Sequence, residues 1–422
     1  MVRFKLATLL VLAGFISASA QVLTLDSCIN AAYRHFSFEQ QIELSNQITD
    51  ANKKRIGKNY LPSLELNAMA TYQNEQISIP VEIPIPGFEA PAAPLNLNSA
   101  LLTLRQWIYD GSQTHYQKLL EDASGRAQTQ EIAVQQLELK TAVMQHYFAA
   151  LLKKKQAEII NEKEIVLDKR LEEARAAVDN HLLLAADFNV LQAEKLKLKQ
   201  QQAELFYSIR ENYTALEQLT GLPFGDESTL LLPDVEMSSS TDLMLRPDVQ
   251  LLNRQMEVLE AQKSLTKSSY LPRLGVFADG GFGLPGYDIF KNEIAPMAKI
   301  GVSLNWRIFD WNKGSVQRQA LSLNQQLLQI KQQQLISQLN VKTQTQLNAM
   351  EKARALMQND NELVELYTEV ADAYAAQLEN GTLTAAEYLT QLNMAQEAKT
   401  NLELHRMQLL VATLNYNTLL GE

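Results

Sequence analysis

The ten residues NGTLTAAEYL, at positions 380–389, repeat the passage NHLLLAADFN, which stands at positions 180–189. An Asn, a Leu and an Ala-Ala pair recur at matching places, and both passages run on to a glycine, Gly221 and Gly421. The same offset of 200 residues relates Asp110 to Asp310. A Tyr-Leu-Pro sequence also occurs twice, at 60–62 and 270–272. Self-similarity at a fixed spacing is the signature of an internal repeat. We therefore predict two copies of one unit of about 200 residues.

The first twenty residues have the features of a secretory signal. Two basic residues precede an apolar run from Leu6 to Ile16, and the small residues at 18–20 predict cleavage before Gln21. No later segment has the roughly 18 apolar residues of a membrane-spanning helix. A net charge of −10 argues against nucleic acid as a partner. The single cysteine, Cys28, cannot form an internal disulfide, and we expect a buried helical thiol, with a lipid-modified N-terminus as the alternative.

Proline placement indicates where long helices can form. All 12 prolines lie at or before Pro296, and none lies between Leu95 and Leu222. Because proline disrupts helix interiors, the proline-free tracts can hold uninterrupted helices. These tracts are rich in Gln, Glu, Lys, Ala and Leu, which favour helix. We predict helices over residues 24–59, 112–179, 184–219, 243–269, 313–379 and 384–420.

The predicted helix lengths indicate how each repeat is built. One long helix is too long to be covered by its hairpin partner alone, so the helix before the strands must cover the rest, along coiled-coil seams. The first repeat then spans residues 21–221 after a signal peptide at 1–20, an inter-repeat linker spans 222–242, and the second repeat spans 243–422.

Between the helices, apolar and polar residues alternate with a period of two. This pattern predicts strands at 63–73, 98–109, 273–283 and 298–309, each with one apolar and one polar face. Strands of about ten residues match the length needed to cross a membrane in a tilted β-barrel. The alternative is a half-buried sheet in a soluble protein, which gives the same alternation.

Aromatic residues and loops favour the membrane interpretation. The aromatic residues near the ends of the second and fourth strands predict a girdle at one bilayer interface; they are Trp107, Tyr109, Trp306, Phe309 and Trp311. The proline-rich segment from Ile77 to Pro94 suits a long external loop. Four strands cannot close a membrane barrel, so several chains must combine. Three chains would give twelve strands; two chains would also close, but narrowly, and geometry alone favours three.

Along its whole mature length the chain resembles the TolC family of outer-membrane efflux channels. The similar features are the opening Leu-Thr-Leu at 23–25, the Leu-Pro before each first strand, Tyr-Asp-Gly at 109–111, the Leu-Thr-Gly at 219–221 and the tip passage at 380–389. The resemblance implies a mixed α and membrane β fold: a trimeric, twelve-stranded β-barrel with four strands per chain, continued by a long α-helical barrel.

The resemblance also implies a tip that docks on an adaptor and opens like an iris. The family's tip motif maps its glycine to Gly381, its threonine to Thr382 and its acid to Glu387. The chain departs from the family at three gate positions, because the family's Arg, Tyr and second acid fall on Leu383, Leu378 and Thr390. The family's gate lock therefore does not transfer directly.

Two sets of tip residues are the candidate sites. Three copies each of Asp187 and Glu387 at a narrow end would focus a negative potential and favour cations. The alternative is that both acids are solvated or partner-facing residues at helix starts. We expect the adaptor-binding tip to comprise Asn180, His181, Leu183, Asn380, Gly381, Thr382, Leu383 and Tyr388. For the two leucines and Tyr388 an exposed groove for a helical hairpin is the expectation, and an intrachain coiled-coil core is the alternative.

No enzyme site emerges from the sequence. The string GFGLPG at 281–286 contains Pro285 and lies at a strand end rather than in a βαβ unit, so a phosphate cradle is not expected. The five histidines have no zinc-type spacing. We therefore predict no catalytic residue, no metal and no cofactor.

The predicted function is a passive channel in the outer membrane of a Gram-negative cell, with its helical barrel in the periplasm. The expected partners are two further copies of the chain, outer-membrane lipid, a periplasmic adaptor and an inner-membrane transporter of the RND or ABC type. The channel would serve a tripartite efflux or type I secretion system. The alternative is a soluble periplasmic coiled-coil adaptor or structural protein.

Overall fold

The computed structural model describes residues 22–77, 92–181, 183–225, 228–238 and 242–421. The expected signal peptide at 1–20 and most of the loop between Ile77 and Pro94 lie outside the described residues. Among the described residues, no helix combines the length and the apolar character needed to cross a bilayer.

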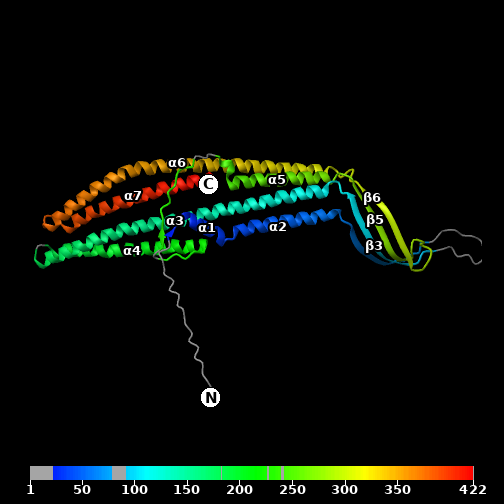
Figure 1. The fold of residues 1–422 in the computed structure, drawn as a ribbon, viewed down its shortest axis with the longest axis horizontal. Coiled ribbons are helices and arrows are strands. Elements are labelled where there is room, and N and C mark those ends of the chain that lie inside the picture. Colours follow the sequence, from blue (N-terminus) through cyan, green and yellow to red (C-terminus); the bar gives the residue numbers. More distant parts are fainter. Residues whose placement is uncertain (1–21, 78–91, 182, 226–227, 239–241, 422) are drawn as a thin grey trace, which may run out of the picture. The chain divides into compact units, whose positions relative to one another are not determined.

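Two helical hairpins dominate the chain. The long helices α3 (Gln113–Asp179) and α6 (Lys313–Glu379) each fold back into a shorter helix, α4 (Ala185–Thr220) and α7 (Ala385–Leu419) respectively (Figure 1). These bounds agree with the predicted ones to within a residue at each end. The proline-free tracts thus form uninterrupted helices, as their composition indicates.

Two predicted helices are interrupted. The predicted helix 24–59 is divided into α1 (Leu25–His35) and α2 (Phe38–Gly57), because Ser37 adopts a left-handed backbone with φ 54°. This break brings Phe38 against Tyr33, with ring centroids 5.9 Å apart. The predicted helix 243–269 becomes a 3-10 turn at Leu243–Leu245 followed by α5 (Pro247–Ser268). The residue before a proline avoids the helical region, and Arg246 is accordingly extended with ψ 135°.

One antiparallel sheet contains the four predicted strands in the order β2-β3-β5-β6. The strands are β2 (Ser63–Tyr72), β3 (Asn96–Tyr109), β5 (Arg273–Leu284) and β6 (Ala295–Asn305). The fourth strand was predicted to run to 309, but it ends at Asn305, where its partner β5 begins at Arg273. Within the described residues, β2 and β6 have one strand neighbour each, so both are edge strands.

The two strand hairpins have the same register. Ser63 pairs with Arg105 in the first hairpin, and Arg273 pairs with Asn305 in the second. Adding 210 to the number of a β2 residue gives its β5 counterpart, and adding 200 to the number of a β3 residue gives its β6 counterpart. The corners after the hairpins also match. The Tyr60 hydroxyl donates a hydrogen bond to Asp110, 2.9 Å away, and the Tyr270 hydroxyl donates to Asp310. The match between the repeats therefore extends from sequence to hydrogen bonding.

The chain forms two compact units that do not coincide with the two repeats. One, here called the hairpin unit, comprises the described residues within 1–39, 135–246 and 338–422, and the other, the sheet unit, comprises those within 40–134 and 247–337. Each unit takes segments from both repeats. The long helices α3 and α6 contribute to both units, so the repeat boundary is not a boundary between folded bodies.

The segment predicted as an inter-repeat linker is part of the hairpin unit. Its strand β4 (Thr229–Leu230) pairs in parallel with β1 (Val22–Leu23). The buried Tyr147 hydroxyl of α3 donates to the Leu231 carbonyl at 2.6 Å and lies 2.9 Å from the Leu23 carbonyl. Part of residues 222–242 is therefore held against the helices, which the sequence pattern did not predict.

Candidate gate and docking site at the helical tip

Equivalent turns join the helices of the two hairpins. His181 and Gly381 adopt left-handed conformations, with φ 60° and 66°, just after α3 and α6. The side chains of Asn180 and Asn380 donate to the carbonyls of Ala176 and Ala376, both at 2.8 Å. A left-handed residue just past the last helical turn is a common helix ending, and glycine adopts it without strain. Both turns therefore begin in the same way, although a histidine occupies the glycine position in the first.

A compact core lies behind these turns. Buried residues of all four helices pack together; they are Ile160, Leu167, Ala174, Leu191, Leu198, Ala375, Leu378, Ala385, Tyr388 and Leu389. Leu183 and Leu383 are partly buried against this cluster. The two hairpins thus share one hydrophobic core near their tips, within the hairpin unit.

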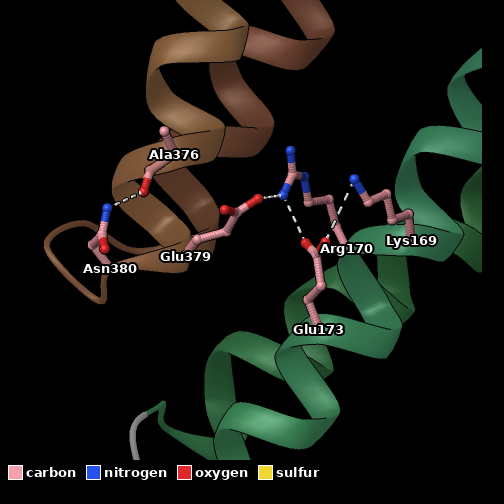
Figure 2. A network of polar contacts seen from close by, with 6 residues as sticks. All are labelled: Lys169, Arg170, Glu173, Ala376, Glu379 and Asn380. Carbon is pink, nitrogen blue, oxygen red and sulfur yellow. Dashed lines mark hydrogen bonds and ion pairs between the residues drawn. The ribbon is translucent and has the colours of Figure 1, made fainter.

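Arg170 connects three helices beside this core. Its guanidinium, on α3, donates to Glu173 at 2.6 Å and to Glu379, the last residue of α6 (Figure 2). It also lies 5.9 Å from the ring centroid of Tyr388, on α7. Burial lowers the pKa of Arg170, but the hydrogen bonds to Glu379 and Glu173 outweigh it and raise the pKa overall, so the side chain stays charged. We call Arg170, Glu379 and Tyr388 the tip clasp.

A second polar group crosses between the hairpins further from the turns. The Lys163 side chain is 5% exposed and donates to Glu194 on α4 at 2.6 Å. It also donates to Asn393 on α7. A buried ammonium group needs such partners, because an unpaired charge in a core is strongly destabilising. Lys163 therefore helps to fix how the two hairpins pack.

The two candidate gate acids lie at helix N-termini. Glu387 forms a capping box with Thr384: the Thr384 amide donates to its carboxylate at 2.9 Å, and the Glu387 amide donates to the Thr384 hydroxyl at 3.3 Å. Those hydrogen bonds lower the pKa of Glu387. Asp187 has Leu184 at the matching cap position, and its carboxylate instead accepts a hydrogen bond from the Ala385 amide of the other hairpin, at 3.1 Å. Both candidate acids therefore lie in the first turn of a helix.

Two candidate residues are buried rather than exposed. Tyr388 is 1% exposed and Leu378 is 8% exposed, and both belong to the shared core. The expectation that Tyr388 lines an exposed groove is wrong, and the alternative of an intrachain core residue holds for it. Leu378 likewise lies on the buried face of α6 and packs in this core. The candidates left exposed at the tip are Asn180, His181, Asn380, Gly381, Thr382, Glu387 and Thr390.

The predicted interface aromatics are all exposed in the single chain. Trp107 and Tyr109 lie at the end of β3, and Trp306 follows directly after β6. The Trp306 indole donates to the Tyr270 carbonyl at 3.1 Å, and the Phe309 and Trp311 rings meet edge to face at 4.9 Å. These residues cluster where strands give way to helices, as predicted.

Sequence patterns did not predict the Arg170–Glu379 contact or the buried Lys163. Arg170 and Glu379 correspond to Val370 and Asp179 in the other repeat, so neither the repeat nor local periodicity pairs them. In the part of the chain that the structure describes, no group of three or more His, Cys, Asp or Glu side chains could hold a metal ion.

Part of the chain matches the model of a known protein family. Residues 240–422 match the model of the outer membrane efflux protein family. The matched stretch is somewhat less than half of the chain. Among curated proteins, the chain is 23% identical over 218 residues to the alkaline protease secretion protein AprF of Pseudomonas aeruginosa. That match covers 49% of this chain and 45% of the relative, so the chain spans a little under half the length of that curated relative.

Solved structures of outer membrane proteins and channels share the fold over nearly the whole chain. The outer membrane protein VceC of Vibrio cholerae matches with a TM-score of 0.70 at 14% identity, covering 94% of this chain and 96% of VceC. The CmeC outer membrane channel of Campylobacter jejuni matches with a TM-score of 0.70 at 13% identity, covering 94% and 85%. The MtrE outer membrane channel of Neisseria gonorrhoeae matches with a TM-score of 0.69 at 14% identity, covering 94% and 88%.

These matches confirm the predicted TolC-type family and the mixed fold of long helical hairpins with an antiparallel sheet. The outer membrane, predicted from the strand pattern, is the location that the family's description names. The relatives are described as channels and secretion proteins rather than enzymes. The alternative of a soluble periplasmic adaptor is not favoured.

Proposed function

We propose that three copies of this chain form a passive duct through the outer membrane, opened at the helical tip by a periplasmic adaptor and served by an inner-membrane transporter. The main support for this proposal is that one face of the sheet is apolar and is not covered by the chain's own residues.

Cross-strand rows show this division of the sheet. Leu64, Leu104, Ala278 and Ile300 lie side by side on one face, across all four strands. The next row on the other face is Glu65, Thr103, Asp279 and Lys299. Lys299 and Asp279 form an ion pair at 3.3 Å there. These two rows give the sheet an apolar side and a side that carries charged residues.

The exposure of the apolar side argues against a soluble half-buried sheet. Leu66 is 71% exposed and Ile300 is 84% exposed. In a soluble protein such a face would pack on a core, because a large apolar surface in water promotes association. A lipid-facing barrel wall needs this arrangement of apolar residues outside and polar residues inside.

The free edges of the sheet support assembly from several chains. An open strand edge in lipid leaves backbone amides and carbonyls without partners, at several kcal/mol for each group. Twelve strands from three chains would close the sheet, and known membrane barrels of this kind contain an even number of strands starting at about eight. The helical hairpins of three chains would then form the periplasmic tunnel.

The tip clasp and the capping contacts support a role for the hairpin turns in opening. Arg170 and Asp187 each bind an element of the second hairpin, so separating the hairpins would break both contacts. The exposed turn residues Asn180, His181 and Gly381 are available to an adaptor. We place the narrow gate at the level of Asp187, Leu383, Glu387 and Thr390. The similarity to a protease secretion protein favours an export system of the efflux or type I secretion class.

Ion selectivity in planar bilayers tests the gate. With purified protein we expect ohmic conductance that favours cations, because three copies of each acid would surround the narrow end. Glu387→Gln should weaken the cation preference, whereas Glu397→Gln, an exposed acid further along α7, should leave it unchanged. Equal selectivity in both variants and in the unaltered protein would place Glu387 outside the pore. A protein that never conducts would contradict the duct itself.

A further inference from the structure

We propose that β6 of one copy pairs with β2 of the next copy in one defined antiparallel register, which sets Arg307 of the first copy opposite Glu65 of the second. The inference rests on the proposed assembly of several chains. It adds the pairing of individual residues, which closure alone does not specify.

The two strands that would meet are edges of comparable length. β2 has ten residues and β6 has eleven, and neither has a second strand neighbour within the described residues. They lie at opposite sides of a four-stranded sheet, three strand spacings or about 14 Å apart. They cannot pair within one chain, so a second copy is the partner of the matching length.

The internal repeat supplies a rule for their register. All ten residue pairs between β2 and β3 have counterparts between β5 and β6, found by adding 210 to the β2 number and 200 to the β3 number. The second hairpin has one additional pair at its end. The two hairpins are therefore structurally equivalent. The junction between them, β3 with β5, should then have a counterpart in the junction of β6 with β2 of the next copy.

Applying the rule gives the residue pairs. Leu104 pairs with Ala278 in the β3–β5 junction. The corresponding residues are Leu304 and Ala68, so these two should lie opposite each other between copies. The remaining pairs on that face are Val302 with Ala70, Ile300 with Tyr72, and Trp306 with Leu66. Apolar residues therefore face apolar residues, whereas a slip by one residue would bring the lipid face against the polar face.

Charge distinguishes this register from slips by two residues. The rule sets Glu65 opposite Arg307, and both side chains are exposed without an ion-pair partner in the described part of the chain. A slip by two residues in either direction would set Glu65 opposite Asn305 or Phe309. Opposite charges directly across neighbouring strands attract, so the proposed register is the one that pairs these two charges.

The end of β6 provides independent support. Its counterpart β3 continues to Tyr109, and the residues after Arg105 pair only with β5, not with β2. In β6 the corresponding residues after Asn305 have no strand neighbour on that side, and regular pairing stops there. The shorter β6 is what a missing neighbour predicts, and the proposed pairing would extend it through Arg307.

Disulfide cross-linking tests the register. In a Cys28→Ser background, Met69→Cys combined with Ser303→Cys places the two thiols directly opposite each other between copies, within disulfide range. Oxidation should shift the denatured protein from the mass of one chain to covalent species of two and three chains, and a reductant should reverse the shift. In the matched control, Thr71→Cys with Ser303→Cys, the two thiols are offset by two residues in the proposed register. This variant should stay at the mass of one chain.

Two outcomes would overturn the proposal. Cross-linking of the control instead of the test pair, or of neither in a particle that keeps the native mass of three chains, would show a different register in an intact assembly. A native mass of one chain would remove the neighbouring copy and would contradict the proposed function as well.

A charge exchange provides a second readout. Glu65→Arg alone should lower the temperature at which the detergent-solubilised oligomer dissociates, because two positive charges would then face each other. Adding Arg307→Glu should restore that temperature. Additive losses in the double variant would show that the two residues do not meet.

Discussion

Arg170 is the residue on which contacts between the two hairpins converge. Its guanidinium touches α6 through Glu379 and approaches the buried Tyr388 ring of α7, while Glu173 pairs with it on its own helix. Glu379 is about half exposed, so water screens that pair and reduces its strength. The Arg170–Glu379 pair is therefore weaker than a fully buried ion pair would be.

We expect Arg170→Ala to weaken the docking of the two hairpins by about 1–2 kcal/mol, since it removes charged hydrogen bonds of which one partner is half exposed. Amide hydrogen exchange around residues 178–188 and 376–390 should become faster. Glu173→Gln is the matched control, because it loses only the contact within α3. Identical exchange in both variants would show that the Glu379 contact does not hold the tip.

Glu387 makes the start of α7 sensitive to acid. Hydrogen bonds from Thr384 hold its pKa below the ordinary range, so the carboxylate stabilises the folded tip above that range and this stabilisation disappears as the pH falls through the lowered pKa. We expect hydrogen exchange at the first turn of α7, corrected for its intrinsic pH dependence, to show added opening in that acidic window. Glu387→Gln should abolish the dependence, and its persistence would assign it to another group.

Cys28 is a buried thiol in α1, as expected from the sequence. Burial raises its pKa to about 11, with a smaller opposing effect from a hydrogen bond with Ser27. Because the thiolate is the reactive form, a maleimide should label the folded protein very slowly at pH 8 and the unfolded protein rapidly. Rapid labelling without denaturant would contradict the packing of α1.

At the scale of elements, the corner between β6 and α6 differs from its counterpart in one packing detail. Gly314 lies under the Tyr270 ring, and a Cβ there would overlap the ring atoms, whereas the matching residue of the first repeat is Thr114. The hydrogen bond between Tyr270 and Asp310 thus depends on a residue without a side chain.

We expect Gly314→Ala to destabilise the protein by about 1–3 kcal/mol through overpacking, even though alanine favours helix. Thermal unfolding of the detergent-solubilised protein measures this. Gly225→Ala is the control, since nothing lies within 4 Å of the added carbon. An unchanged unfolding temperature for Gly314→Ala would mean that the corner can relax.

The elements differ in how well their sequence specifies them. The hairpin helices were predicted to within a residue at each end because proline, glycine and the repeat mark their limits. The break at Ser37 was not predictable, since no glycine or proline stands there and the break serves the packing of Phe38. The early end of β6 was missed because a strand also needs a neighbour, which alternation does not supply.

At the tip, too, local contacts could be predicted from the sequence, whereas contacts between residues distant in sequence could not. Capping at Thr384 and Glu387 follows from local sequence, and both acids were recognised as helix-start residues in one of two interpretations. The Arg170–Glu379 contact joins residues 209 positions apart on different helices, so no local pattern reveals it. The burial of Tyr388 was likewise decided by the packing of four helices.

In the molecule as a whole, the sheet is the part that a single chain cannot complete. Its apolar face is exposed, its two edges are free, and its polar face carries an ion pair between β5 and β6. In a closed barrel, lipid would cover the apolar face, further copies of the chain would pair with the two edges, and water inside the barrel would contact the polar face. Each unsatisfied feature of the isolated chain thus points to the same membrane-embedded assembly.

The most direct test is membrane fractionation followed by the native mass of the detergent-extracted protein. We predict that the protein is recovered with the outer membrane and that the extracted particle contains roughly three chains, as closure of twelve strands requires. Recovery as a soluble monomer or dimer would contradict the barrel and with it the duct.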